Sequence, residues 1–516
     1  FYIVSSFNAP PFFLLNIPAQ DPFGKGPSAR MLTPRGPHGT VPPQMVRALR
    51  RILAIDIGTS SIKVGVVSSE GRLLAEHRRT LVEASSSPDG WTAGVWDGAL
   101  RDALIAMGRE FPEFRGVDGI AISGNGPTII PVDQTGTPLE PVLLWFDSRG
   151  DRAEGTRSFF LPKIQWLKEK HPGVYDRAST LYSCPEFFAF RITGEAWTIS
   201  PNDEFAPHIW SDEEIERYGI DSRKLPPYIP MTGRMGRVTR EAAVTYGLEE
   251  GVPVFASGSD FLASLIGTAT VRPGRTCDRA GTSEGINHCH DRYVSDPRLR
   301  CLPHAVPGLY NVAGILASTG RIFEWFRSIS GQHRVPYSTM LEQIVDVGLE
   351  HHVPWFFPSI HQGAAWEFSR GMFIDLGAQH GAPEMGRAVV ESIGYAVRES
   401  VEILAQGGCE IAELRVCGGQ AKNDIWNQLK SDMIGKPLAI PEVADAELLG
   451  SAACALVGLG DFGDLVEAAD ELVRISRRLE PSRERFAVFG EKYLRYQEAY
   501  GRFRRALSEC GSLFGS

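Results

Sequence analysis

The sequence lacks the short motifs that mark several common classes of protein. Its eight cysteines are scattered and none forms a C-x-x-C pair, which favours reduced thiols over a disulfide framework. No apolar run reaches the ~18 residues of a membrane span. No G-x-x-x-x-G-K-[ST] loop occurs, and no G-x-G-x-x-G opens a helix after a strand. These absences exclude a P-loop nucleotide site and disfavour a Rossmann dinucleotide site.

An excess of positive charge is also missing. The 516 residues carry 53 Lys and Arg against 62 Asp and Glu, a formal net charge of −9. We therefore expect no nucleic-acid partner and no membrane association, since both favour basic surfaces. The apolar and charged fractions, 43% and 22%, are ordinary for a globular protein. The length predicts two domains or three, and the reduced thiols predict a cytoplasmic protein.

Two segments leave alternatives open. The first 44 residues contain nine prolines and a single acid, Asp21, and show no sustained period. They are a disordered tail, a targeting peptide, or sequence upstream of a true start at Met45, and we favour the last. We therefore set residues 1–50 aside as a disordered or mis-included extension, and residues 506–516 as a tail. His288-Cys289-His290 lacks a second ligand cluster, so ordinary loop histidines explain it better than a metal site.

Apolar runs and turn residues from Arg51 onward predict an α/β protein. The predicted strands cover residues 52–57, 62–67, 72–79, 119–124, 252–260, 275–285 and 414–419. The predicted helices cover residues 96–111, 261–268, 386–406, 423–434, 444–459 and 486–507. Proline and glycine cluster in residues 302–312, which we interpret as the crossing between two halves of the chain.

Two Gly-Thr-Ser turns follow apolar strands, at Gly58-Thr59-Ser60 and Gly281-Thr282-Ser283, and Gly418-Gly419 makes a third turn. Successive backbone N–H groups in such turns form anion-binding concavities. Asp56 and Asp260 lie at or just beyond the ends of buried strands, although each could simply cap a neighbouring turn. Phosphoryl transfer needs one carboxylate to hold Mg²⁺ and another to take the proton of the attacking hydroxyl. The pattern therefore predicts a site whose turns bind a polyphosphate, with two acids beside it.

Taken in order, these residues resemble the FGGY carbohydrate kinase family of the actin–hexokinase–Hsp70 superfamily, and most of all its xylulokinase branch. The resemblance covers about residues 51–505. The segments that carry it are Asp56-Ile57-Gly58-Thr59-Ser60, Trp145-Phe146-Asp147-Ser148-Arg149, Pro162-Lys163 with Trp166, Arg191-Ile192-Thr193-Gly194-Glu195, Gly258-Ser259-Asp260, Gly281-Thr282-Ser283, Gly320, Gly418-Gly419 with Asn423, and Gly450-Ser451-Ala452-Ala453.

The resemblance implies two actin-like (ribonuclease H-like) domains with ATP and Mg²⁺ in the cleft between them. Residues 51–300 would bind sugar and phosphate, residues 301–505 would bind adenosine, and each domain would have a five-stranded sheet. Asp260 would be the catalytic base and Asp56 the metal-holding residue. The nucleotide would lie on Gly58, Thr59, Ser60, Gly281, Thr282, Ser283, Gly320, Gly418, Gly419 and Asn423. The sugar would contact Asn125, Thr128, Asp147, Arg149 and Phe261. Lys63 either approaches the phosphates or is a solvated strand lysine. Assembly into a homodimer is a further alternative that the sequence leaves open.

Several sugar-facing positions depart from the family. Xylulokinases have Gln-Met-His-Gly after the strand at 119–123, where this chain has Gly124-Asn125-Gly126-Pro127-Thr128. Gly126-Pro127 cannot supply the Arg-Glu pair of glycerol kinases, and Phe261 stands where the family generally has Asn or Gln. The phosphate and nucleotide motifs are kept, so we expect an ATP-dependent kinase acting on a hydroxyl of a ketose such as xylulose, or of a related sugar or polyol.

Two other functions stay open, a catalytically impaired sugar- and ATP-binding protein and an actin-like ATPase regulator. Asp56, Asp260 and both Gly-Thr-Ser turns are retained in the sequence. These residues favour an active kinase.

Overall fold

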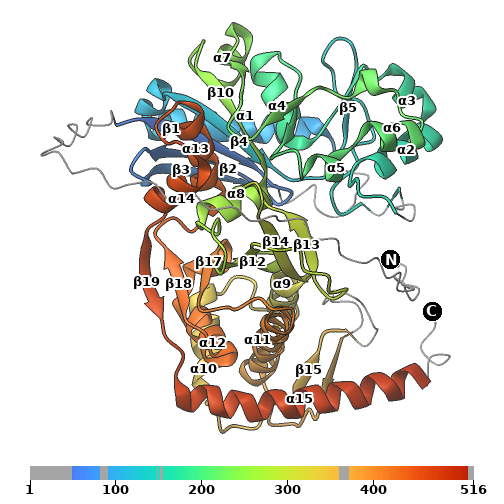
Figure 1. The fold of residues 1–516 in the computed structure, drawn as a ribbon. Helices are drawn as coiled ribbons and strands as arrows, with labels where there is room; N and C mark the ends of the chain where they lie inside the picture. Colours follow the sequence, from blue (N-terminus) through green and yellow to red (C-terminus); the bar gives the residue numbers. More distant parts are fainter. Residues whose placement is uncertain (1–48, 82–90, 148, 151–154, 360–370, 510–516) are drawn as a thin grey trace, which may run out of the picture. The chain divides into compact units, whose positions relative to one another are not determined.

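The structure is a computed structural model, and it describes residues 49–81, 91–147, 149–150, 155–359 and 371–509. Within them the chain forms two β-sheets flanked by helices (Figure 1). This arrangement confirms the predicted two-domain α/β fold class. The predicted N-terminal extension lies outside the described residues except for Leu49 and Arg50. The predicted C-terminal tail is partly helical, because the last helix continues to Glu509.

The first sheet has six strands among the described residues. Their order is β3 (Leu73–Thr80), β2 (Ser61–Ser68), β1 (Arg51–Ile57), β4 (Gly119–Gly124), β10 (Pro253–Ser259) and β9 (Arg234–Arg237). β1, β4 and β10 run parallel, and β2 pairs antiparallel with β1. β1, β2 and β4 are buried over almost their whole length. Burial on both faces explains why the sequence shows continuous apolar runs in these strands.

The second sheet has seven strands in the described part of the chain. Their order is β13 (Arg300–Pro303), β14 (Tyr310–Leu316), β12 (Glu284–His290), β11 (Thr276–Ala280), β17 (Leu414–Cys417), β18 (Leu438–Pro441) and β19 (Ile475–Leu479). β11, β17 and β18 run parallel, and β12 pairs antiparallel with β11. The expectation of five strands per domain was therefore wrong for both sheets.

The division between the two sheets comes earlier in the chain than residue 300. β11 and β12 pair with β17 and β14, so residues 276–290 belong to the second sheet. The segment 302–312 is not a crossing, because β13 and β14 pair antiparallel across it, and Pro307 and Gly308 lie in the turn between them. The chain instead leaves the first sheet through α8 (Asp260–Gly267) and residues 268–275.

Short strand pairs and helices complete the described fold. The pairs are β5 (Ile130–Val132) with β6 (Thr180–Tyr182), β7 (Thr198–Ser200) with β8 (Tyr228–Pro230), and β15 (Trp355–Phe357) with β16 (Met372–Ile374). The remaining helices are α1 (Ala93–Glu110), η2 (Pro112–Gly116), α2 (Leu161–Lys170), α3 (Pro172–Arg177), α4 (Cys184–Thr193), α5 (Ala206–Ile209), α6 (Asp212–Arg217), η3 (Ser222–Lys224), α7 (Arg240–Tyr246), α9 (Thr319–Ile329), α10 (Tyr337–Asp346), α11 (Ala382–Gln406), η4 (Gly419–Lys422), α12 (Asp424–Ile434), α13 (Ala446–Gly458), α14 (Leu465–Leu472) and α15 (Arg483–Glu509).

The core of the first sheet is completed by a helix from the far end of the chain. α13 packs on β1, β4 and β10, and it also lies directly against α8 (Figure 1). Leu448, Leu449 and Ala452 of α13 are buried in the same apolar cluster as Ile52 and Leu53 of β1. The junction between the sheets is therefore made by two packed helices, α8 and α13.

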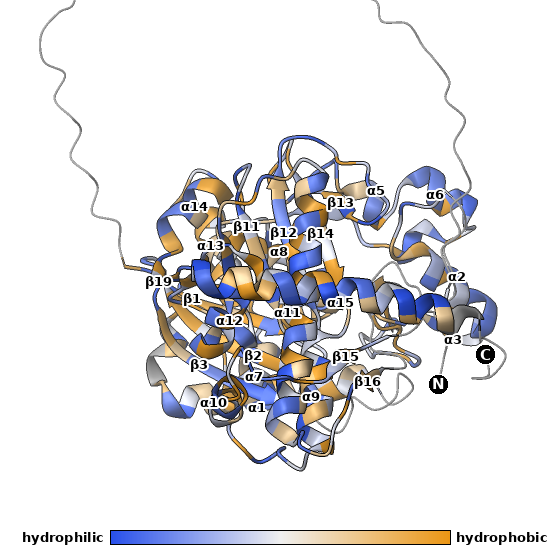
Figure 2. Cartoon of the chain, turned by 90° about the horizontal axis from the view of Figure 1, so that it is seen from below, coloured by the Kyte–Doolittle hydropathy of each residue, from blue (hydrophilic) through white to orange (hydrophobic). Residues whose placement is uncertain are grey.

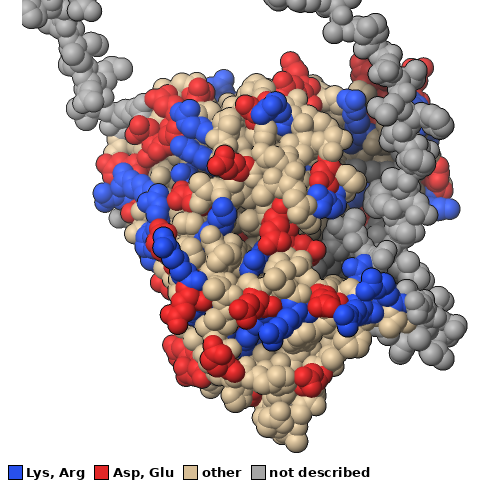
Figure 3. Space-filling view, turned by 60° about the horizontal axis from the view of Figure 1, so that its bottom comes forward, with Lys and Arg blue, Asp and Glu red and all other residues tan. Residues whose placement is uncertain are grey.

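The outer surface carries α15, which packs against α12 (Figure 2). Phe489 and Tyr493 of α15 are buried, and the Tyr493 ring lies 5.5 Å from that of Tyr395 on α11. The face drawn in Figure 3 carries Lys and Arg side chains interspersed with Asp and Glu. None of the helices in the described residues combines the length and apolarity needed to span a membrane.

Candidate functional site

The two Gly-Thr-Ser turns are the tips of two hairpins that face one cavity. The first tip joins β1 to β2, where the Gly58 N–H donates to the Ser61 carbonyl at 3.0 Å. The second joins β11 to β12, where the Gly281 N–H donates to the Ser283 carbonyl at 2.9 Å. Both tips line a cavity of ≈ 1070 Å³, to which each sheet contributes one hairpin. A cavity of this size accommodates a nucleotide together with a small second substrate.

The second hairpin tip lies against the beginning of α9. A Cβ at Gly320 would come 2.1 Å from the Gly281 carbonyl oxygen, so glycine is required for the helix to approach the turn. The Arg321 N–H also donates to the Thr282 carbonyl at 3.2 Å. The other residues expected to bind adenosine, Gly418, Gly419 and Asn423, line the same cavity as Gly320. The Asn423 side chain accepts from the Trp426 N–H at 3.0 Å, which begins α12.

Asp56 lies in β1 at the end that faces the cavity. Its side chain is 3% exposed, and the Ser123 hydroxyl donates to its Oδ1 at 2.9 Å. Burial raises the pKa of Asp56 to about 7, although the nearby Lys63 opposes the shift. A buried carboxylate of this kind is stabilised by any added cation. The described residues contain no cluster of three or more His, Cys, Asp or Glu that could hold a metal. Mg²⁺ in kinases often takes only one or two carboxylates, with phosphate and water completing the shell, and Asp56 fits that use.

Asp260 is the first residue of α8, immediately after β10. Its Oδ1 accepts from the Phe261 N–H at 2.7 Å. Its Oδ2 accepts from the Arg279 guanidinium at 2.6 Å. Asp56 and Asp260 therefore both line the cavity, as the sequence predicts, but each has neighbours that the sequence does not indicate.

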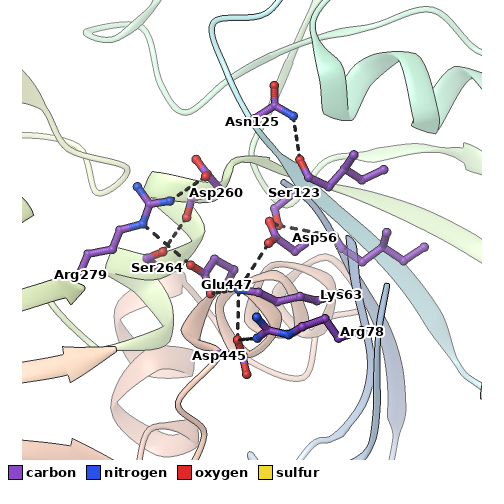
Figure 4. A network of polar contacts seen from close by, with 12 residues as sticks. Asp56, Lys63, Arg78, Ser123, Asn125, Asp260, Ser264, Arg279, Asp445 and Glu447 are labelled. Atoms are coloured by element: carbon purple, nitrogen blue, oxygen red, sulfur yellow. Dashed lines mark hydrogen bonds and ion pairs between the residues drawn. The ribbon is translucent and has the colours of Figure 1, made fainter. Parts of the chain in front are cut away.

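These two acids belong to one network of charged side chains, some buried and some partly exposed (Figure 4). The Lys63 ammonium lies 3.7 Å from Asp56, 3.1 Å from Asp445 and 3.2 Å from Glu447. Burial opposes the charge on Lys63, but the three carboxylates more than offset it and raise the pKa of Lys63. Arg78 and Lys422 both bind Asp445, at 2.6 Å and 2.7 Å. Lys63 is therefore a buried network residue and not a solvated strand lysine.

Arg279 connects the network to Asp260. Besides its 2.6 Å contact with Asp260, its Nε lies 3.8 Å from the Glu447 carboxylate. Burial opposes the guanidinium charge, but Asp260 and Glu447 more than offset it and raise the pKa of Arg279. The side chain stays charged at any pH at which the protein is folded.

The residues expected to contact the sugar fall into two groups. Asn125 and Phe261 line the cavity, together with the indole of Trp145, which is 44% exposed. Thr128, Asp147 and Arg149 are not among the described residues that line it. Thr128 donates to the Asn125 side-chain oxygen at 2.6 Å, and Arg149 Nε donates to Asp147 at 2.8 Å. Thr128 and Asp147 are buried, whereas the Arg149 side chain is partly exposed.

A buried lysine holds the segments that carry these residues. The Lys163 ammonium donates to the Pro127 carbonyl at 3.1 Å and also to the Leu144 carbonyl. The Arg149 guanidinium lies 4.9 Å from the centre of the Trp166 ring. The family landmarks Lys163 and Trp166 therefore position the loops that carry Asn125 and Trp145.

Several charged residues of the cavity were not predicted from the sequence as site residues. They include Arg78, Arg279, Glu284, Arg300, Lys422 and Glu447. The one local signal was the pair Asp278-Arg279 within a strand that is otherwise apolar or small. Asp278 and Glu284 flank the second hairpin tip and both bind the buried Lys430 of α12, at 2.6 Å and 2.5 Å. Burial, with Glu284 adding to it, raises the pKa of Asp278 to about 8.

Comparison with known proteins agrees with this architecture. Residues 51–155 and 152–267 match the N-terminal domain of the FGGY family of carbohydrate kinases, and residues 279–459 match its C-terminal domain. The xylulose kinase of Lactococcus lactis is 27% identical over 448 residues, 80% of this chain and 89% of that protein. The autoinducer-2 kinase of Salmonella paratyphi A is 28% identical over 380 residues, 68% of this chain and 70% of that protein. The gluconate kinase of Lactobacillus acidophilus shares the fold with a TM-score of 0.75 at 20% identity, over 91% of this chain and 100% of that one.

The two sheets each contribute a Gly-Thr-Ser hairpin to one cavity, and together with these similarities this arrangement defines a sugar kinase. The chain belongs to the FGGY family of carbohydrate kinases, as the motifs predict. Sugar kinases of this family use ATP. The two matched domains meet between residues 267 and 279, close to the division that the strand pairing gives.

Proposed function

We propose that this protein transfers the γ-phosphoryl group of ATP to a hydroxyl of a small carbohydrate, a ketose such as xylulose or a related sugar or polyol. The observation that carries the proposal is that Asp56, Asp260 and both Gly-Thr-Ser tips line one cavity. Phosphoryl transfer needs these parts, because amides hold the phosphates, one carboxylate faces the metal and another faces the acceptor. The similar proteins include a xylulose, an autoinducer-2 and a gluconate kinase, so the proposal names a class of acceptor.

Each part of the site has a proposed role. Asp260 takes the proton of the acceptor hydroxyl as its oxygen attacks the γ-phosphorus. Asp56 would hold Mg²⁺, which supplies positive charge against the phosphate oxygens. The hairpin tips donate to the phosphates, and the glycines and Asn423 on the second sheet's side receive the adenosine. These nucleotide-binding residues are Gly58, Thr59, Ser60, Gly281, Thr282, Ser283, Gly320, Gly418, Gly419 and Asn423.

The acceptor is proposed to bind beside Asp260, against Asn125, Phe261 and Trp145. The flat face of an aromatic ring suits the apolar face of a sugar, and Trp145 offers such a face. Thr128, Asp147 and Arg149 are proposed to act indirectly, by fixing Asn125 and the loop of Trp145. The contact of Arg300 with the Phe261 ring, 5.6 Å from guanidinium to ring centre, adds a positive charge to this end.

A coupled assay of ADP release tests the proposal. The wild-type protein with Mg²⁺-ATP is offered pentuloses, hexuloses, polyols and sugar acids in turn. ADP release that depends on one acceptor class supports the proposal and identifies that class. No acceptor-dependent release across the whole panel favours the binding-protein alternative. ADP release that is equal with and without sugar favours the ATPase alternative.

Asp260→Asn separates the proposed base from a merely structural acid. The amide keeps the shape but cannot accept the proton, and loss of a general base costs about 10²–10⁴-fold in rate. We expect kcat to fall at least about a hundredfold, while Mg²⁺-ATP binds within a few-fold of wild type. Asp221→Asn is the matched control, because Asp221 also pairs with an arginine, Arg223, but on the exposed surface. Turnover of Asp260→Asn near the wild-type rate would remove Asp260 from the mechanism.

A further inference from the structure

Arg279 is a cation in the cavity whose hydrogen-bonded partner is the proposed base. It is the next-to-last residue of β11, two positions before the hairpin tip Gly281-Thr282-Ser283. Its side chain turns toward α8 and meets the Asp260 carboxylate at 2.6 Å (Figure 4). The side chain is 32% exposed, so it faces the open space of the cavity as well as Asp260.

The other cations of this network are held by other acids. Lys63 lies among Asp56, Asp445 and Glu447, while Arg78 and Lys422 bind Asp445. Arg279 reaches Glu447 only at 3.8 Å, so its short contact is with Asp260. A guanidinium is a planar fork that suits phosphate oxygens at least as well as a carboxylate.

The transferred phosphoryl group must lie close to this pair. An acceptor hydroxyl that donates to Asp260 has its oxygen about 3 Å from the carboxylate, and that oxygen attacks phosphorus from about 3–3.5 Å. The γ-phosphoryl group is then on the order of 6 Å from Asp260. An arginine side chain anchored beside the hairpin tip reaches that distance by a change of rotamer. Asp260 and the γ-phosphate therefore compete for one guanidinium.

We propose that Arg279 is a catalytic residue that exchanges Asp260 for the γ-phosphoryl group when ATP binds. The inference rests on the proposed function of the cavity. Movement of the Arg279 guanidinium to the γ-phosphate frees lone pairs of Asp260 for the acceptor hydroxyl. It also places positive charge where the transition state spreads negative charge over the phosphoryl oxygens.

The chemical step stays balanced in this arrangement. The acceptor oxygen forms a bond to the γ-phosphorus as the bond from phosphorus to the β–γ bridging oxygen breaks. The electron pair of that bond remains on the β-phosphate of ADP, and the hydroxyl proton passes to Asp260. Arg279 exchanges no proton and contributes hydrogen bonds alone.

Nucleotide affinity without any acceptor measures the contact directly. Calorimetry of Arg279→Gln should show a non-hydrolysable ATP analogue binding about tenfold or more weakly than to wild type, since a charge-assisted hydrogen bond is lost. ADP, which lacks the γ-phosphate, should bind within about twofold. Arg223→Gln removes an arginine from an exposed Arg–Asp pair and should leave both affinities unchanged. Equal changes for the two nucleotides, or none for either, would overturn the proposal.

Competition between Asp260 and phosphate gives a second, sharper test. Asp260→Asn releases Arg279 from its carboxylate partner, so the ATP analogue should bind about three- to fivefold more tightly and ADP should not. In the Arg279→Gln background the same Asp260→Asn substitution should give no tightening, as a double-mutant cycle measures. Tightening that persists without Arg279 would reflect simple repulsion between Asp260 and phosphate, and it would overturn the exchange.

Two further measurements test the role of Arg279, the turnover of Arg279→Gln and the nucleotide affinity of the conservative variant Arg279→Lys. In the wild type's best acceptor reaction, Arg279→Gln should lower kcat by about 10³-fold or more, and added guanidinium ion should restore part of it. Arg279→Lys keeps the charge but lacks the planar guanidinium, so it should weaken binding of the ATP analogue less than Arg279→Gln does. Arg279→Lys also replaces Arg279→Gln in the assay if Arg279→Gln fails to fold. Failure of the proposed function appears separately, as a wild type without acceptor-dependent ADP release.

Discussion

The carboxylates around the cavity are matched by cations that come from both sheets. Asp56, Asp260, Asp445 and Glu447 are opposed by Lys63, Arg78, Arg279 and Lys422. The buried members are Asp56, Lys63, Asp445 and Glu447. Removing one of them leaves an uncompensated buried charge, which costs more than the pair contributes. A bound nucleotide with the proposed Mg²⁺ would add charge of both signs to this set.

Asp56→Asn should act on metal use more than on folding. Lys63 keeps Asp445 and Glu447 as partners after the substitution, while the proposed metal ligand loses its charge. We expect the Mg²⁺ concentration for half-maximal ADP release to rise about tenfold or more. A Mg²⁺ titration at saturating ATP measures this shift, with Asp221→Asn as the control. An unchanged Mg²⁺ dependence would exclude Asp56 as the metal-facing residue.

Phe261→Asn should change the choice of acceptor. The Phe261 ring cannot donate to a sugar hydroxyl, and leaving such a hydroxyl unpaired costs about 1–3 kcal/mol, or roughly ten- to more than a hundredfold in specificity. D-xylulose should therefore be a poorer acceptor for the wild type than for a typical xylulose kinase, and its kcat/KM should rise about tenfold in Phe261→Asn relative to the best wild-type acceptor. If D-xylulose has the highest kcat/KM for the wild type, Phe261 does not set specificity.

Asp56 and Asp260 were predictable because an acid at the end of an apolar strand, next to a turn of small residues, is visible in a short stretch of sequence. Asp56 and Lys63 face each other across β1 and β2, but the longer-range contacts of the network were not predictable. Lys63 meets Glu447 across 384 positions of chain, and Arg279 meets an acid on a different element. A contact of that kind depends on how the two sheets pack, which local pattern does not encode.

At the scale of elements, the two hairpins carry most of the site. Each tip follows a strand that is buried, so the tip is fixed by the sheet behind it. The second tip is held from a further side, because Lys430 of α12 binds Asp278 before it and Glu284 after it. The helix capped by Asn423, on the proposed adenosine side, is thereby connected to the hairpin proposed to bind phosphate.

α4 gives a pH-dependent prediction, because Glu186 in its first turn is buried. The Ile199 N–H donates to Glu186 at 3.1 Å, and burial raises its pKa to about 7. The folded chain therefore holds a proton that the unfolded chain releases near its ordinary pKa of 4.5. The free energy of unfolding contributed by this group falls as pH rises from about 4.5 to about 7 and is then constant.

Glu186→Gln removes this titration while keeping an acceptor for Ile199. In urea unfolding, the variant should differ little from wild type at pH 5 and be up to about 3 kcal/mol more stable at pH 8. Glu216→Gln, on the exposed side of α6, is the control for the substitution itself. A difference between Glu186→Gln and wild type that is equal at both pH values would contradict the assignment.

Elements were predictable where one pattern extends over many residues, as in β1, β2, β4 and α11. The prediction that residues 302–312 form a crossing was wrong, because proline and glycine mark hairpin turns and linkers alike. The short strands β5 to β8 gave no periodic signal over their three residues each. The membership of β11 and β12 in the second sheet depends on pairing with β17 and β14, which lie far along the chain.

At the scale of the molecule, the chain passes between its two sheets at α8 and again at α13. α8 leads from β10 to β11, and α13 follows β18 back to the first sheet. Any movement of one sheet relative to the other around bound ligands must be accommodated at these helices. The same helices carry Asp260 and Glu447, so the junction also supports the residues of the proposed site.

Gly450→Ala should disturb this junction and the site together. A Cβ at Gly450 would lie 1.9 Å from the Ala263 carbonyl oxygen of α8, so the two helices must separate. We expect the free energy of unfolding to fall by about 1–3 kcal/mol or more, and kcat to fall about a hundredfold, since a displacement near 1 Å has that effect on catalysis. Gly98→Ala is the control: it lies in α1 with nothing within 4 Å of the added methyl, and should gain about 0.5–1 kcal/mol. Urea unfolding and acceptor-dependent ADP release measure both variants. If Gly450→Ala matches wild type in both, α8 and α13 do not meet at this glycine, and the junction does not position Asp260.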